Sequence, residues 1–104
     1  KMEKKNIAGV DIMFSEDGFF ADASQWNREI AAEIAKEDGI ILSDDHYAVL
    51  EYLRKEHAAG APLTIRKVGK SGIVDIKGLY KLFPGGPLKL SSKYAGIPKP
   101  TSCI

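Results

Sequence analysis

The hydrophobic residues near the start of this 104-residue chain follow the spacing of a β-strand. Within residues 7–20, IAGVDIMFSEDGFF, the apolar side chains of Val10, Ile12 and Phe14 occupy every second position. SEDG supplies turn chemistry, and a return strand would begin at Phe19. We therefore predict a β-hairpin. Because two strands alone are only marginally stable, we expect helices to cover it.

Further along, the apolar spacing changes to the three and four residues typical of an amphipathic helix. Trp26, Ile30 and Ile34 predict a first helix from about Ser24 to Asp38, with Asp22 or Ser24 as its N-cap. We interpret Trp26 as a core anchor beside the hairpin. A second helix is predicted over about residues 44–59, with Ser43 as its N-cap and Gly60 as its stop. Its apolar face consists of Tyr47, Val49, Leu50 and Leu53.

Three shorter helices are predicted in the last third of the chain. Thr64 can cap one or two helical turns in LTIRKVGK, and Asp75 can cap a second short helix in DIKGLYKLF, which Pro84 ends. Pro87 can open a last helix, LKLSSKYA, which Gly96 stops.

Together these elements predict an α+β protein that is mostly α, with a small N-terminal antiparallel β-ribbon packed on about five helices. Residues 1–96 would form a single globular domain, and residues 97–104 a flexible, mobile C-terminal arm. The composition, 44% hydrophobic and 28% charged, is typical of a soluble domain. We expect no membrane association, because no apolar run approaches the roughly 20 residues of a membrane-spanning helix.

The chain ends in GIPKPTSCI, where the helical spacing stops. Pro98 and Pro100 lack an amide donor and bias their predecessors towards extended geometry, so this arm cannot be helical. Cys103 lies seven residues after Gly96. At about 3.3 Å per residue, the arm could reach roughly 23 Å from the body. We expect this reach to be set by Gly96, Pro98, Lys99 and Pro100.

Cys103 is the only cysteine and the penultimate residue. One thiol cannot form an internal disulfide, which fits a reducing, cytoplasmic location. A thiolate at the tip of a narrow arm can enter a partner's pocket, attack a sulfur atom held there and leave with it as a persulfide. A free thiol is mostly protonated at neutral pH, and nothing in KPTSCI favours the thiolate, so the partner would have to activate it. The alternative is an incidental tail cysteine.

Charge is divided unevenly along the chain. Residues 1–60 carry 7 Lys/Arg and 13 Asp/Glu, a balance of −6, whereas residues 61–104 carry 8 Lys/Arg and only Asp75, a balance of +7. A basic half indicates an acidic partner, unless the two halves neutralise each other within the fold. Docking on a protein is our first interpretation, and direct RNA or DNA binding the alternative. The candidate docking residues are Arg66, Lys67, Lys70 and Lys81.

Residues 79–104 resemble the C-terminus of the DsrC/TusE family. The family pattern is L-F-P-x-G-P, followed by A-G-[LI]-P-K-P-x-x-C and one aliphatic residue. It is matched here by Leu82, Phe83, Pro84, Gly86, Pro87, Ala95, Gly96, Ile97, Pro98, Lys99, Pro100, Cys103 and Ile104. Weaker similarity in residues 17–40, 42–54 and 62–68 extends the resemblance over nearly the whole chain.

The resemblance implies a sulfur carrier with a persulfide on Cys103, a sulfurtransferase-type protein rather than a stand-alone catalyst. Relatives of the TusE type imply a sulfur relay complex as donor and a tRNA 2-thiouridylase as acceptor. Relatives of the sulfite reductase gamma-subunit type have a second cysteine where this chain has Ser92, and serine cannot form a disulfide. A sulfite-reductase-associated subunit and a regulatory nucleic-acid-binding relative are kept as alternatives.

The two histidines complete the candidates. His46 and His57 are eleven residues apart, without the short ligand spacing of a metal site, and we expect no metal and no cofactor. His46 falls in the first turn of the second helix and is interpreted as a solvated surface residue. A nucleophilic pair of Cys103 with a histidine is kept as an alternative, since its members need only meet in space. GKSG, residues 69–72, lacks phosphate-loop spacing and is interpreted as a turn.

Overall fold

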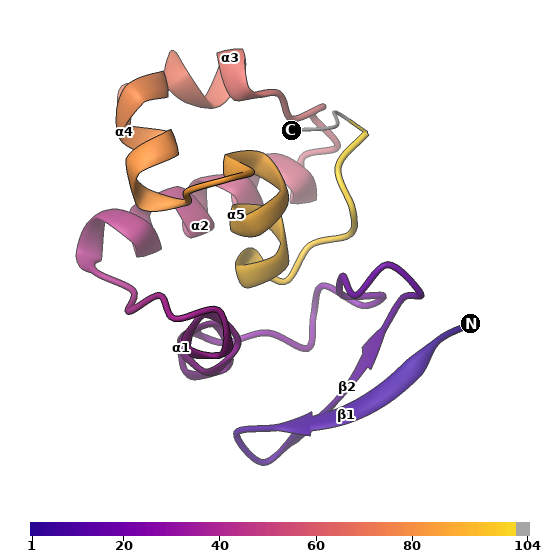
Figure 1. The fold of residues 1–104 in the computed structure, drawn as a ribbon. Coiled ribbons are helices and arrows are strands. Elements are labelled where there is room, and N and C mark those ends of the chain that lie inside the picture. Colours follow the sequence, from indigo (N-terminus) through magenta and orange to yellow (C-terminus); the bar gives the residue numbers. More distant parts are fainter. Residues whose placement is uncertain (102–104) are drawn as a thin grey trace.

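The fold is a β-hairpin followed by five helices in a computed structural model that describes residues 1–101 (Figure 1). The hairpin lies at one end of the molecule, α3 and α4 lie at the other, and α2 packs mainly on α5 between them. The predicted class, α+β and mostly α, is confirmed. The elements are β1 (Glu3–Ile7), β2 (Val10–Phe14), α1 (Arg28–Glu37), α2 (Asp44–Ala58), α3 (Ile65–Gly69), α4 (Ile76–Leu82) and α5 (Pro87–Ala95).

The hairpin differs from the prediction in its pairing, although β2 lies where the alternation places it. Its partner is the preceding strand, with Glu3 opposite Phe14 and Ile7 opposite Val10. The two-residue turn between the strands, Ala8–Gly9, has positive φ at both positions, which matches the twist of paired strands. The sequence does not reveal β1 because EKKNI is largely exposed and polar and therefore shows no alternation.

The SEDG segment does form a turn, in which the Gly18 N–H donates to the Ser15 carbonyl. The chain after it does not continue as a strand. Only Phe20 pairs back, in a single bridge with Phe14, and the two rings meet edge to face with centroids 5.1 Å apart. The predicted return strand is thus reduced to one bridge.

Helix α1 begins at Arg28 rather than near Ser24. Its N-cap is Asn27, whose side chain accepts a hydrogen bond from the Ile30 N–H at 2.8 Å. The predicted caps serve the preceding loop instead, where Asp22 accepts from both the N–H and the hydroxyl of Ser24. Trp26 therefore precedes the helix.

The other helix ends lie where local chemistry predicts them. Ser43, Thr64 and Asp75 cap α2, α3 and α4 through their side chains. Pro87 opens α5, and Gly96 ends it in the left-handed conformation.

The core draws on β2, the turn after it and all five helices. Its fully buried side chains include Ile12, Phe20, Ile30, Leu50, Leu53, Val68, Leu79, Leu88 and Tyr94. Within residues 1–101, none of the helices has the length and apolar composition needed to span a bilayer.

His46 is buried, so its interpretation as a solvated surface residue is wrong. Its Nδ1 accepts from the Ser43 N–H at 3.0 Å, and its Nε2 lies 2.9 Å from the Leu82 carbonyl oxygen. This arrangement corresponds to the neutral ring with its proton on Nε2. The reason for the burial is that the last turn of α4 packs over the first turn of α2, where Phe83 meets the imidazole edge to face. Helical spacing alone could not show this contact.

Candidate functional site

The predicted site is the C-terminal arm, and its thiol, Cys103, lies outside the residues that the structure describes. The root of the arm is described. At Gly96 φ is 70° and ψ is 31°, and its N–H donates to the Lys93 carbonyl. The Ile97 N–H reaches back to the Ser92 carbonyl at 3.3 Å. These two bonds form a Schellman motif, which ends the helix and turns the chain away from its axis.

The first residue of the predicted arm belongs to the core. Ile97 is 1% exposed, whereas Pro98 and Lys99 are exposed and Pro100 is partly buried. The packed body thus extends at least to Ile97, and motion of the residues beyond it stays a prediction. Lys99 Nζ lies 3.9 Å from Asp17 Oδ2 in the SEDG turn after β2, a contact between half-exposed groups that contributes little to stability.

Two main-chain carbonyls at the end of α5 are bound by side chains from distant parts of the chain. The Trp26 Nε1–H donates to the Tyr94 carbonyl at 2.7 Å. Arg54, from α2, donates through Nη1 to the Ala95 carbonyl and through Nη2 to the Ala23 carbonyl, both at 2.9 Å. The last carbonyls of a helix have no partner within the helix, so these contacts replace water at the point where the arm begins.

Arg54 also covers the indole of Trp26, with its guanidinium carbon 4.3 Å from the ring centroid. Partial burial lowers the pKa of Arg54, although Glu51 nearby favours its charge. The arginine stays protonated in any case, because its pKa begins so far above neutrality. A planar cation with several donors suits this position, since it stacks on a ring and holds two carbonyls at once.

Gly96 is required at the root for two separate reasons. Its positive φ disfavours any residue with a Cβ. A Cβ at this position would also lie 2.3 Å from Cδ1 and 2.7 Å from Cγ of Trp26, which is far inside contact distance. The absent side chain lets the indole lie directly against the main chain.

Ser92, the position of the second cysteine in two-cysteine relatives, is fully buried. Within residues 1–101 its Oγ has no hydrogen-bond partner, and an unsatisfied buried hydroxyl is destabilising. The pocket around it therefore offers nothing that a hydroxyl needs.

Tyr94 ties α5 to the end of α1. Its hydroxyl donates to Asp38 Oδ2 at 2.7 Å, and its ring is buried beside Phe83. Burial, followed by the hydrogen bond and charge of Asp38, raises the pKa of Tyr94 well above its usual range. The last turn of α5 is thus held from three sides, by Trp26, Arg54 and Asp38.

The candidate docking residues lie on α3, at its C-cap Lys70 and on α4. The two helices contact each other at the end of the molecule away from the hairpin (Figure 1). Arg66, Lys70 and Lys81 are exposed. Lys67 is partly buried and bound within the fold, where its Nζ lies 2.7 Å from Glu56 Oε1. Apolar side chains are exposed among these cations. We call the group formed by Arg66, Lys70, Ile73, Ile76, Lys77, Tyr80 and Lys81 the α3–α4 surface.

The histidines are not brought together. His46 is buried under α4, and His57 is exposed near the end of α2. Among residues 1–101 no three His, Cys, Asp or Glu side chains are placed to share a metal ion.

Sequence reasoning missed Arg54 and the indole N–H of Trp26. One signal was present for Arg54, which follows Tyr47 and Leu50 at helical spacing and therefore lies on the apolar stripe of α2. A cation on such a stripe indicates a buried partner.

The fold and this root define a class: a small helical body that ends in a fixed turn from which a C-terminal segment departs. A family model described as DsrC like protein matches residues 6–104. Sulfurtransferase TusE of Escherichia coli (strain K12) is 35% identical over 104 residues, covering 92% of this chain and 95% of the relative. Sulfurtransferase TusE of Buchnera aphidicola subsp. Acyrthosiphon pisum is 39% identical over 97 residues, covering 85% and 84%.

Solved structures agree. Allochromatium vinosum DsrC has a TM-score of 0.80 and 28% identity, with 100% of both chains covered. The oxidized gamma-subunit of the dissimilatory sulfite reductase from Archaeoglobus fulgidus has a TM-score of 0.80 and 31% identity, covering 98% of this chain and 100% of that one. The chain belongs to the DsrC-like family, as its C-terminal pattern predicts.

Proposed function

We propose that the protein is a sulfur carrier, which accepts sulfane sulfur as a persulfide on Cys103 and passes it to an acceptor protein. The observation that carries the proposal is the single penultimate thiol, placed seven residues after the turn that ends α5. Its similarity to proteins named sulfurtransferase TusE supports the same role.

The proposed chemistry needs one thiol and no external oxidant. The Cys103 thiolate attacks the terminal sulfur of a donor persulfide, a new S–S bond forms as the donor's S–S bond breaks, and the donor leaves as a thiolate. Delivery is the same exchange in the other direction, with the acceptor's thiolate as nucleophile. Because Ser92 cannot act as a second thiol, the carrier has no internal route to discharge its sulfur.

Intact mass measurement tests this role directly. Incubation with glutathione persulfide should add one sulfur atom to the protein, and the addition should disappear in Cys103→Ser. If the wild-type protein gains no sulfur while the reagent persulfidates a control protein thiol, the carrier role is wrong.

The identity of the acceptor separates two versions of the proposal. A tRNA 2-thiouridylase fits the similarity to TusE, and the catalytic subunits of a dissimilatory sulfite reductase fit the similarity to its gamma-subunit. We favour the relay version, because Ser92 removes the second thiol. Gel filtration with sulfite reductase stripped of its own gamma-subunit distinguishes the versions, since a stable stoichiometric complex would favour the second.

We further propose that the basic residues Arg66, Lys67, Lys70 and Lys81 guide docking on an acidic protein. Exposed cations at the rim of an interface mainly raise the association rate. Lys67 should contribute less than the others, because Glu56 already neutralises it. Ile73, Ile76 and Tyr80, exposed at 45%, 44% and 43%, favour a protein partner over a nucleic acid, since two of them are aliphatic and cannot stack on bases.

A further inference from the structure

The contacts at the end of α5 do more than complete a helix terminus. They bind three segments to one another: the loop before α1, the helix α2 and the end of α5, from which the arm departs. We propose that Trp26 and Arg54 form a latch on the root of the arm and act as positioning residues for sulfur transfer. They fix the direction in which the chain leaves the body. The inference rests on the proposed carrier role of Cys103.

The latch acts on the carbonyls that immediately precede the turn. The Tyr94 and Ala95 carbonyls belong to the last two residues of α5, and Gly96 follows directly. Hydrogen bonds from a charged donor are stronger than those between neutral groups. Stacking on the indole removes one face of the guanidinium from water, which strengthens its hold on the two carbonyls.

The direction of the root matters because the arm is long and narrow. The six residues that follow Ile97, ending at Cys103, span at most about 20 Å. A rotation of about 30° at the root would displace an extended tip by about 10 Å. Because reacting sulfur atoms must come within a few ångströms of each other in the right orientation, a displacement of this size would carry the thiol out of a partner's site.

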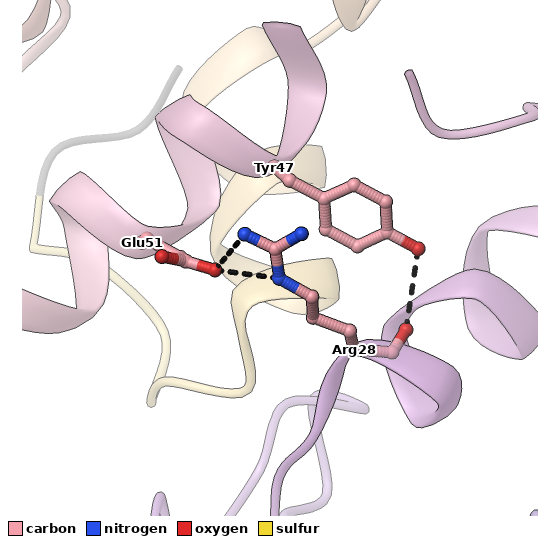
Figure 2. A network of polar contacts seen from close by, with 3 residues as sticks. All are labelled: Arg28, Tyr47 and Glu51. Atoms are coloured by element: carbon pink, nitrogen blue, oxygen red, sulfur yellow. Dashed lines mark hydrogen bonds and ion pairs between the residues drawn. The ribbon is translucent and has the colours of Figure 1, made fainter. Parts of the chain in front are cut away.

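Arg28 provides a matched control elsewhere in the molecule (Figure 2). Its guanidinium carbon lies 4.7 Å from the ring centroid of Tyr47, and its Nε donates to Glu51 at 2.7 Å. The Tyr47 hydroxyl donates to the Arg28 carbonyl at 3.3 Å. Arg28 is thus a second arginine that stacks on an aromatic ring and joins two segments, but its polar contacts tie α1 to α2 and not to α5.

Amide hydrogen exchange tests the latch without sulfur chemistry. In Arg54→Met, which keeps an apolar stem over the indole, the amides of Gly96 and Ile97 should exchange about tenfold faster than in the wild type. In Arg28→Met they should exchange at the wild-type rate. Unchanged exchange in Arg54→Met would overturn the proposal, and so would an equal acceleration at every core amide, which would indicate a merely structural role.

The direction of the arm can be measured through the effective concentration of the Cys103 thiol at a reporter thiol on the body. Asp17 suits this purpose because Lys99 already lies beside it, and Cys103 follows Lys99 by four residues. In Asp17→Cys, the equilibrium between the internal disulfide and glutathione gives the effective concentration of Cys103 at that position. Adding Arg54→Met should lower this value about three- to tenfold, and adding Arg28→Met should leave it unchanged. Equal values in all three proteins would overturn the proposal.

Two further variants keep the result interpretable. Trp26→Phe keeps an aromatic ring, although a smaller one, and removes the donor to the Tyr94 carbonyl, so it should show the same local effects if Arg54→Met does not fold. Arg54→Lys can hold only one carbonyl well and should lie between the wild type and Arg54→Met. Persulfide loading of Cys103 by glutathione persulfide should be equal in all variants. Its absence from the wild type would refute the carrier role and leave the exchange and disulfide results standing.

Discussion

The cations at the root of the arm and those on the α3–α4 surface lie in opposite environments. At the root, Arg54 is partly buried and holds two carbonyls and a ring. On the α3–α4 surface, none of the cations has an acidic partner within 4.0 Å among residues 1–101, and three apolar side chains are exposed between them. The cations of this surface are Arg66, Lys70, Lys77 and Lys81.

The difference separates two tasks of a carrier. The root satisfies its polar groups internally, which makes its geometry independent of any partner. The α3–α4 surface leaves charge and apolar area in water, which an acidic partner with an apolar centre could cover. Substitutions at the root should therefore change structure and stability, whereas substitutions on the surface should change association and leave stability nearly unaltered.

Gly96→Ala should have the largest effect. The left-handed backbone costs an alanine about 1–2 kcal/mol, and the overlap with Trp26 adds about 1–3 kcal/mol, so the free energy of unfolding should fall by about 3 kcal/mol. Urea denaturation measures it. The control is Gly60→Ala, at a position with φ of 73° and nothing within 4 Å of an added Cβ, which should cost only the backbone strain. Equal losses in the two variants would show that the indole does not press on the root.

The triple variant Arg66→Ala, Lys70→Ala, Lys81→Ala should have the second-largest effect. The effect should be on association with a partner and not on stability. We expect sulfur transfer to a partner protein to slow about tenfold at low salt, with the difference shrinking above 0.1 M salt, where screening acts over about 10 Å. The midpoint of urea unfolding should not move. The single variant Lys67→Ala should slow transfer less, because Glu56 already pairs with it.

The same triple variant tests the nucleic-acid alternative. A salt-sensitive shift of tRNA or DNA that the variant abolishes, together with unaltered transfer between proteins, would assign the α3–α4 surface to a nucleic acid. A loss of stability in the triple variant would contradict the expectation that substitutions on the α3–α4 surface change association and leave stability nearly unaltered.

Rising alkaline pH should lower the free energy of unfolding gradually, through the ionisation of Tyr94. The pKa of Tyr94 is raised in the folded protein above its ordinary value of 10.0, so the unfolded chain releases this proton first. The stabilisation is complete below about pH 10 and is lost progressively as the pH rises from there. Urea denaturation between roughly pH 9 and 11 should show this decline, and Tyr94→Phe should reduce its slope.

Ser92→Ala should have the smallest effect, neutral or stabilising by up to about 1 kcal/mol, because it removes a buried hydroxyl that has no hydrogen-bond partner within residues 1–101. Its neighbour provides the control. Ser91 is equally buried, but its hydroxyl donates to the Leu88 carbonyl at 3.2 Å, so Ser91→Ala should cost about 1 kcal/mol. A loss in Ser92→Ala as large as that in Ser91→Ala would show that the hydroxyl at 92 has a partner after all.

The sequence by itself determined the features that depend on neighbouring residues. Ser43, Thr64 and Asp75 cap their helices through amides three residues ahead, and Pro87 and Gly96 act through their own φ angles, so each boundary follows from a short stretch of chain. The C-terminal pattern and its single thiol are equally local, and they were sufficient to indicate the family.

Only the tertiary structure decided which distant groups meet. Arg54 reaches the Ala95 carbonyl across 41 residues, and Trp26 reaches the Tyr94 carbonyl across 68. The burial of His46 depends on its contact with the end of α4, and the enclosure of Ser92 depends on the packing of α5 on α2. Capping needs only the few residues around a helix end. A hydrogen bond to a distant main-chain carbonyl leaves no pattern in the sequence around that carbonyl, because every residue carries the same group.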